Sequence, residues 1–380
     1  MSFLKNLLAL TMGLASLGEV YAGLDLTSTS NVVVYWGQNS FSGNGDLAQQ
    51  PLSHYCDDSN IDVIVMAFLM RVNGQGGAPE VDLANIGNGC TRFEGTNLLN
   101  CPDVGSDITT CQKKGKTILL SIGGATYSEG GFQSESAARE GADLIWKTFG
   151  PPQSDMRHTN TTVHLNTTRG PTVRRQQAVH RPFGNAVLDG YDFDFEANVF
   201  NMAPFANRLR ELSDADHSRQ YFLTAAPQCP YPDQADKDIL NGPVSVDAVF
   251  VQFYNNYCGV DAFAPGKDVQ NNFNFADWDN WAKNVSQNKN ARVFLGAPAN
   301  TGAASTGYMP IDQLTPVVEY SKKFSSFGGV MLWDVTQAYG NPGFLHGLRQ
   351  TLGTAKSAIT RSYRYRSGIT RPYRYRPGRR

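Results

Sequence analysis

Three acidic residues recur at every second position in the stretch AVLDGYDFDFEANVF, residues 186–200. Asp192, Asp194 and Glu196 alternate with aromatic residues, and this period is typical of a β-strand, in which residues i, i+2 and i+4 share one face. Carboxyl groups crowded in a protein interior cannot all ionise cheaply, so at least one is expected to hold a proton near neutral pH. Glu196, the last acid of the row, is suited to donate that proton to a leaving oxygen. Cleavage of a glycosidic bond requires this step.

Two simpler interpretations of the acidic row compete with catalysis. A solvated strand face would explain the alternation, but a water-facing strand is difficult to place in a parallel sheet that is covered on both sides. A calcium loop is a poorer explanation, because the turn glycine and the distant bidentate glutamate of an EF-hand are missing. We therefore favour a row whose acids point into the protein interior while the aromatic residues pack outward beneath helices.

The elements that position this row are predicted from short apolar, β-branched runs separated by spacers of helical length. There are eight such runs, at residues 32–36, 63–69, 117–122, 186–195, 221–225, 248–253, 293–297 and 330–333. Near-continuous apolar strands joined by crossovers indicate a buried parallel sheet. Eight of them in a chain of this length favour a (β/α)8 TIM barrel over an open doubly wound sheet.

In such a barrel the chemistry lies at the C-terminal ends of the strands. Polar and aromatic residues gather at these ends, in the segments YWGQN (35–39), SIGGA (121–125), DFDFE (192–196), QFYNN (252–256) and LWD (332–334). Other catalytic signatures are missing from the sequence. It contains no G-x-S-x-G nucleophile elbow and no H-E-x-x-H zinc helix, and the GKT at 115–117 lacks the glycine of a phosphate-binding loop.

The segment DGYDFDFE, residues 189–196, matches the whole D-G-x-D-x-D-x-E signature of glycoside hydrolase family 18. The motifs VYWGQN (34–39), SIGG (121–124), VQFYNN (251–256) and GGVMLWD (328–334) agree with the same family on other predicted strands. Together they resemble the class III, hevamine-like chitinases of plants and fungi, over residues 31–348. The resemblance implies an endo-type chitinase that hydrolyses β-1,4 linkages between N-acetylglucosamine units and acts without a metal or cofactor.

The resemblance also implies a role for each catalytic residue. Glu196 would be the general acid and later the base, and no second carboxylate would act as nucleophile, because the acetamido oxygen of the substrate attacks the anomeric carbon. Asp194 would orient that acetamido group and share a proton with Asp192. Tyr254 would hydrogen-bond the acetamido oxygen, although a buried tyrosine can also be a satisfied core residue.

Five further residues are implied as substrate-binding. Trp333 would form the floor under the reacting sugar, although a tryptophan at the end of an apolar run is more often part of the core. Gln252 would assist near Asp194. Tyr35, Phe68 and Gly124 would line the cleft, where the SIGG motif equally suits an ordinary tight exit from a strand.

The charge of the chain is unevenly distributed. The formal net charge is −1, yet residues 354–380 contain eight Arg and one Lys without an acid, so the preceding residues carry −10. An acidic body would repel phosphates, which argues against nucleic acid as a partner. The implied partners are chitin or chitooligosaccharides, and we expect a monomer. The tail repeats ITRSYRYRSG as ITRPYRYRPG, a composition that predicts a basic, disordered extension.

Residues 1–22 read as a secretory signal, with Lys5, a short apolar run and a Val-Tyr-Ala cleavage site. No later run is long enough to span a membrane, so we expect a secreted protein. Residues 23–353 would form the catalytic barrel. Residues 156–180 interrupt it with four Arg, three His and no acid. We interpret this insertion as either a retained intron or a glycosylated loop, lying at the face opposite the site.

Six cysteines in an exported chain indicate disulfides rather than a metal site, and no C-x-x-C spacing suggests zinc. Spacing alone leaves their pairing open. The resemblance to the hevamine-like enzymes implies the pairs Cys56–Cys111, Cys90–Cys101 and Cys229–Cys258. The sequons at Asn160, Asn166 and Asn284 could carry glycans.

Two rival functions share the barrel and its motifs. One is an endo-β-N-acetylglucosaminidase that acts on the N-glycans of glycoproteins, since the same signature serves both activities. The other is an inactive chitin-binding lectin. Glu196 argues against the lectin, because lectins of this kind typically lack the acid.

Overall fold

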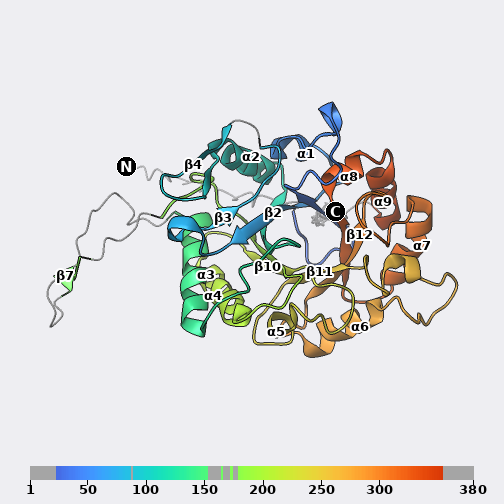
Figure 1. Cartoon of the computed structure of the whole chain (residues 1–380). Helices are drawn as coiled ribbons and strands as arrows, with labels where there is room; N and C mark the ends of the chain where they lie inside the picture. Colours follow the sequence, from blue (N-terminus) through green and yellow to red (C-terminus); the bar gives the residue numbers. More distant parts are fainter. Residues whose placement is uncertain (1–22, 87–88, 153–163, 166–171, 174–178, 354–380) are drawn as a thin grey trace, which may run out of the picture.

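The computed structural model describes residues 23–86, 89–152, 164–165, 172–173 and 179–353. Within them, eight parallel strands form a closed barrel, because β1 pairs with both β2 and β13. The barrel strands in chain order are β1 (Asn31–Trp36), β2 (Val63–Arg71), β6 (Thr117–Gly123), β9 (Gly190–Asp194), β10 (Phe222–Ala225), β11 (Ala248–Gln252), β12 (Arg292–Pro298) and β13 (Phe327–Trp333). Helices surround this barrel (Figure 1). The predicted (β/α)8 TIM barrel is confirmed.

The helices lie mostly in the crossovers between consecutive barrel strands. They are α1 (Leu52–Tyr55), α2 (Pro102–Lys113), α3 (Glu135–Phe149), α4 (Met202–Ala215), α5 (Lys237–Leu240), α6 (Phe275–Asn280) with its π-helical continuation η5 (Trp281–Val285), α7 (Ile311–Ser321), α8 (Val335–Tyr339) and α9 (Phe344–Leu352). Further short elements lie in the connections. Among the described residues they are the 3-10 turns η1 (Gly45–Leu47), η2 (Gln75–Gly77) and η4 (Val260–Ala262) and the strands β3 (Glu80–Val81), β4 (Thr91–Arg92), β5 (Leu99–Asn100), β7 (His164–Leu165) and β8 (Thr172–Val173). None of the helices within the described ranges is long and apolar enough to cross a membrane.

The fourth barrel strand is shorter than predicted. The sequence predicts a strand over 186–195, whereas β9 begins at Gly190, where its pairing with both β6 and β10 starts. Residues before it form a turn, in which the amide of Ala186 donates to the carbonyl of Phe183 at 3.1 Å. Apolar composition alone could not distinguish this turn from a strand. At its other end β9 stops at Asp194, so Glu196 lies in the loop that follows it.

Side chains alternate between two layers along each strand, as expected for a sheet buried on both faces. In β1, Val33 and Tyr35 belong to the cluster inside the barrel, whereas the residues that alternate with them along the strand pack in the layer beneath the helices. The same period applies to β9. Tyr191 and Phe193 pack in the outer layer, where the ring of Phe193 lies 6.3 Å from that of Phe205 on α4. Asp192 therefore points into the barrel.

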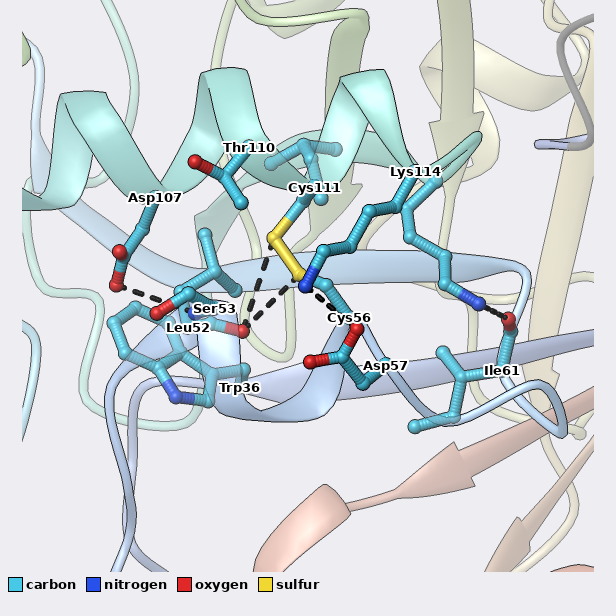
Figure 2. Close-up of a disulfide and its surroundings, with 12 residues drawn as sticks. Trp36, Leu52, Ser53, Cys56, Asp57, Ile61, Asp107, Thr110, Cys111 and Lys114 are labelled. Carbon is cyan, nitrogen blue, oxygen red and sulfur yellow. Dashed lines mark hydrogen bonds and ion pairs between the residues drawn. A yellow bond between two sulfur atoms is a disulfide. The ribbon is translucent and has the colours of Figure 1, made fainter.

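Three disulfides contain all six cysteines, in the pairing that the resemblance implied: Cys56–Cys111, Cys90–Cys101 and Cys229–Cys258. Figure 2 shows the first of them, which joins the end of α1 to α2. Beside it, Lys114 forms an ion pair with Asp57 at 2.6 Å. The third disulfide joins the loop after β10 to the loop after β11.

Most of the predicted insertion at 156–180 lies outside the described residues, as do the predicted signal at 1–22, the tail at 354–380 and the sequons at Asn160 and Asn166. The segment that flanks the insertion is described. The Arg181 guanidinium donates to the carbonyls of Lys147 at 2.9 Å and Gly150 at 2.7 Å, so it ties the start of this flank to the end of α3. That end lies at the N-terminal side of the strands, opposite the acidic row.

Candidate active site

Asp192 lies at the centre of a hydrogen-bond network inside the barrel. Its carboxyl group is fully buried and accepts from the hydroxyls of Tyr35 at 2.7 Å, Ser121 at 2.7 Å and Thr224 at 2.6 Å. These donors come from β1, β6 and β10, so three strands converge on one side chain. Burial raises the pKa of Asp192, and the three hydroxyls oppose that rise because they stabilise the ionised form.

Asp194 has a different environment although it lies two residues away. The amide group of Gln252, at the end of β11, donates to its carboxyl oxygen at 2.8 Å. Burial, followed by the charges of Glu196 and Asp192, raises the pKa of Asp194 well above its usual range. Of the buried pair, Asp194 is therefore the acid whose protonated form its surroundings favour more, while the three hydroxyls favour the charged form of Asp192.

Glu196 stands at the mouth of the barrel, where solvent reaches its side chain. The surrounding loops nevertheless withdraw part of the carboxyl group from water, and this desolvation, together with the charge of Asp233, raises its pKa. Glu196 also lines a cavity of about 310 Å³ that lies against the loop after β10. A carboxylic acid that is both reachable and protonated above its ordinary range can donate a proton to a bound molecule.

An aromatic group borders the same end of the barrel. The ring of Trp333 stacks on that of Phe68 with centroids 5.9 Å apart and planes at 20°, and lies 5.5 Å from that of Tyr35. Gly124 allows Phe68 to take this place, since a Cβ at Gly124 would lie 2.7 Å from the Phe68 ring. The amide of Gly124 also donates to the carbonyl of Asp194 at 2.7 Å. The loop after β6 therefore connects the aromatic group to the acidic row.

Asp334, the residue that follows Trp333, forms hydrogen bonds that connect the end of β13 to neighbouring segments. The carboxylate of Asp334 caps α8 by accepting from the amide of Gln337 at 3.0 Å, and it also accepts from the hydroxyl of Thr336 at 2.6 Å. The amide of Ser40, in the loop after β1, donates to the same carboxylate at 3.3 Å. Asp334 thus holds the C-terminal ends of β13 and β1 together under the aromatic group.

Tyr254 lies just beyond β11 and is 6% exposed. Its pKa is raised well above the usual range by burial and then by the charges of Asp194 and Glu196, which places its hydroxyl in the electrostatic field of both acids. Gln252 donates to the carbonyl of Ala226 at 2.8 Å as well as to Asp194, which fixes the orientation of its amide group.

All nine residues that the sequence and the resemblance singled out are gathered at one end of the barrel: Tyr35, Phe68, Gly124, Asp192, Asp194, Glu196, Gln252, Tyr254 and Trp333. Sequence reasoning missed the hydroxyl donors Ser121 and Thr224 and the two acids Asp233 and Asp236 after β10. The signal for the acids was available in PYPDQAD, residues 230–236, because this segment follows the C-terminal end of a predicted strand.

The arrangement is suited to acid catalysis on a carbohydrate. It provides a carboxyl group with a raised pKa at an open mouth, a second, buried acid beside it, and aromatic rings against which the apolar face of a sugar can pack. No group of three or more His, Cys, Asp or Glu side chains that could hold a metal ion occurs in the part of the chain that the structure describes.

Comparisons with known proteins agree with this geometry. The chain is 47% identical over 361 residues to a class III chitinase of Arthroderma benhamiae, which covers 95% of this chain and 97% of the relative. It is 44% identical over 342 residues to endochitinase 33 of Trichoderma harzianum, with 90% of this chain and 97% of the relative covered. Among solved structures, the ICChI chitinase from Ipomoea carnea matches with a TM-score of 0.63 and 26% identity, covering 85% of this chain and 100% of that chain.

The family assignment covers most of the barrel and its acidic row. Residues 31–309 match the glycosyl hydrolases family 18, a range that begins at the first residue of β1 and includes Glu196 and Tyr254. The chain thus belongs to the glycosyl hydrolases of family 18.

Proposed function

We propose that this protein is an endo-type chitinase that hydrolyses the β-1,4 linkages between N-acetylglucosamine units of chitin. The observation that carries the proposal is the pair of adjacent acids with raised pKa values: Asp194, which is buried, and Glu196, which is open to solvent. The relatives support the substrate, since two fungal proteins that are 47% and 44% identical bear the names chitinase and endochitinase.

In the proposed mechanism, Glu196 donates its proton to the oxygen of the scissile bond, and that bond breaks as the oxygen of the substrate's own N-acetyl group attacks the anomeric carbon. The resulting oxazolinium ion replaces a covalent glycosyl-enzyme. Glu196, now ionised, removes a proton from a water molecule. This water attacks the same carbon and opens the oxazolinium ring, and the configuration at that carbon is retained.

Asp194 suits the task of holding the acetamido group. Its carboxyl oxygen can accept a hydrogen bond from the N–H of the group, and passing its proton to Asp192 leaves Asp194 negatively charged as positive charge develops on the oxazolinium ring. Tyr254 would hydrogen-bond the acetamido oxygen, and its buried position near both acids supports this role. Gln252 would act indirectly, because its contact with Asp194 fixes the orientation of that acid.

The aromatic group would bind the sugar before the scissile bond. Trp333 is only partly buried, and its stacking on Phe68 leaves it available as the floor of the site. Tyr35 would serve mainly through its hydrogen bond to Asp192, and Gly124 by leaving room for Phe68.

The decisive variant is Glu196→Gln, which removes the transferable proton with little change of shape. We expect turnover of soluble chitin oligosaccharides to fall by about 10²–10⁴-fold, the usual contribution of acid catalysis, while binding to chitin persists. Glu140→Gln on the outer face of α3 is the matched control and should keep wild-type turnover. Turnover by Glu196→Gln within a factor of about two of wild type would overturn the assignment.

The same assay separates the rival functions. An endo-β-N-acetylglucosaminidase would release glycans from an N-glycoprotein and leave chitin oligosaccharides intact. A lectin would bind chitin and hydrolyse neither substrate. We also propose that the protein is secreted and acts as a monomer, with residues 1–22 removed. The three disulfides and the exposed sequon residue Asn284 are compatible with that destination.

A further inference from the structure

The loop after β10 brings a carboxyl group into the cavity that Glu196 lines. Asp233 is 6% exposed and belongs, with Glu196, to the lining of this cavity. Its carboxyl group accepts from three backbone amides, those of Gln228 at 3.1 Å, Ala235 at 2.8 Å and Asp236 at 2.7 Å. Burial raises the pKa of Asp233, and the three backbone amides oppose that rise because they fix the carboxyl group in one place and stabilise its charged form.

Asp236 lies beside Asp233 but lacks its hydrogen bonds. Its carboxyl group is fully buried, and no hydrogen bond of good geometry from the described residues reaches either oxygen, although the amide of Phe195 lies near enough to lower its pKa somewhat. Burial, followed by the charge of Asp233, outweighs that amide and raises the pKa of Asp236 well above its usual range. Of the two acids, Asp233 is therefore the one whose charged form its surroundings stabilise more, through the three amides.

Asp233 is also the fixed charge to which Glu196 is most exposed. Burial favours the protonated form of Asp194, and the carboxyl group of Asp192 accepts from three hydroxyls within the barrel. Among the residues that the structure describes, no lysine, arginine or histidine lines the cavity beside Asp233. The titratable groups that influence or face Glu196 are Asp192, Asp194, Tyr231, Asp233, Asp236 and Tyr254.

We propose that Asp233 is a positioning residue of the reaction, whose fixed negative charge keeps the catalytic proton on Glu196 until a substrate arrives. The inference rests on the proposed role of Glu196 as the acid. Asp233 takes no proton from the substrate and needs no contact with it. Its effect is transmitted through space, because a nearby negative charge makes the ionisation of Glu196 less favourable.

The test is the pH dependence of kcat/KM on soluble chitin oligosaccharides, whose alkaline limb reports loss of the proton from the essential acid of the free enzyme. Asp233→Asn keeps an oxygen for the amides but removes the charge. We expect its alkaline limb to move to lower pH by about 0.5–1 unit. Asp238→Asn, on the exposed side of α5, makes the same change in net charge and should keep the wild-type limb.

A merely structural role would give a different result. If Asp233 only supported its loop, Asp233→Asn would lower kcat/KM at every pH and leave the limb in place, and that result would overturn the inference. Circular dichroism shows whether the variant folds. If Asp233→Asn does not fold, Asp233→Ser, whose hydroxyl can accept from the same amides, is used for the same test. An unmoved limb in an active enzyme refutes only this inference. A wild-type protein without turnover, or an active Glu196→Gln, refutes the proposed function and the inference together.

Discussion

The hydrogen bonds around Asp192 allow a matched pair of variants to be compared. Tyr35 and Tyr191 are both 1% exposed, so Phe at either position loses one buried hydroxyl and little else. The Tyr35 hydroxyl donates to the carboxylate of Asp192 at 2.7 Å inside the barrel. The Tyr191 hydroxyl points to the outer layer, where it has no hydrogen-bond partner among the described residues. The two substitutions therefore differ in one interaction.

The difference in stability follows from the charge on the acceptor. A hydrogen bond to a charged group contributes about 1.5–3 kcal/mol to stability, so Tyr35→Phe should lower the free energy of unfolding by about 2 kcal/mol. Ser121 and Thr224 still donate to Asp192 in that variant, which prevents a larger loss. Tyr191→Phe removes a buried hydroxyl that makes no hydrogen bond to the described residues. The free energy of unfolding should therefore change by no more than about 0.5 kcal/mol.

Urea unfolding at pH 7, followed by tryptophan fluorescence with the disulfides intact, measures both variants. We expect a clearly lower midpoint for Tyr35→Phe at an unchanged m-value, and a wild-type midpoint for Tyr191→Phe. Equal midpoints for the two variants would show that the Tyr35 hydroxyl does not stabilise a charged Asp192. A loss confined to Tyr191→Phe would mean that the orientation of β9 is wrong.

Three further predictions concern the site and its supports. Because the pKa of Glu196 is raised, its acid form persists above the ordinary value of 4.5, so the alkaline limb of kcat/KM should lie above that pH; a limb below it would contradict the assignment. Replacing both Cys229 and Cys258 by Ala opens a link across 29 residues, which should cost about 3.5 kcal/mol in urea unfolding, and an unchanged midpoint would show that the bridge does not constrain the unfolded chain. Truncation after Gly353 should leave turnover of soluble oligosaccharides unchanged, and a truncated protein that fails to fold would make the tail part of the barrel.

Much of the fold could be predicted from the sequence because its signals are local. The run VVVYW and its seven counterparts are each apolar over the length of a strand. Where such a strand begins and ends depends on a few adjacent residues of the sequence. The orientation of Asp192 also follows from local alternation, because Tyr191 and Phe193 must be covered by helices. The one clear error, the start of β9, arose where an apolar turn precedes the strand.

The charge states within the site could not be predicted in this way. Asp192 and Asp194 occupy equivalent positions in the alternation, yet the first accepts from three hydroxyls and the second from one amide group. Those donors lie on four other strands, so their identity depends on how the barrel closes. Sequence alone therefore predicts that at least one acid of the row holds a proton, and the tertiary structure distinguishes the surroundings of Asp192 from those of Asp194.

By itself, then, the sequence determined the barrel, the acidic row and its inward direction, and through a family resemblance the pairing of the cysteines. Only the tertiary structure placed Asp233, which lies 37 positions after Glu196 in the chain, in the same cavity. The physical reason is range: strand periodicity depends on neighbours two to four residues apart, whereas an electrostatic influence depends on distance in space. That distance is set when loops from different strands meet at one end of the closed barrel.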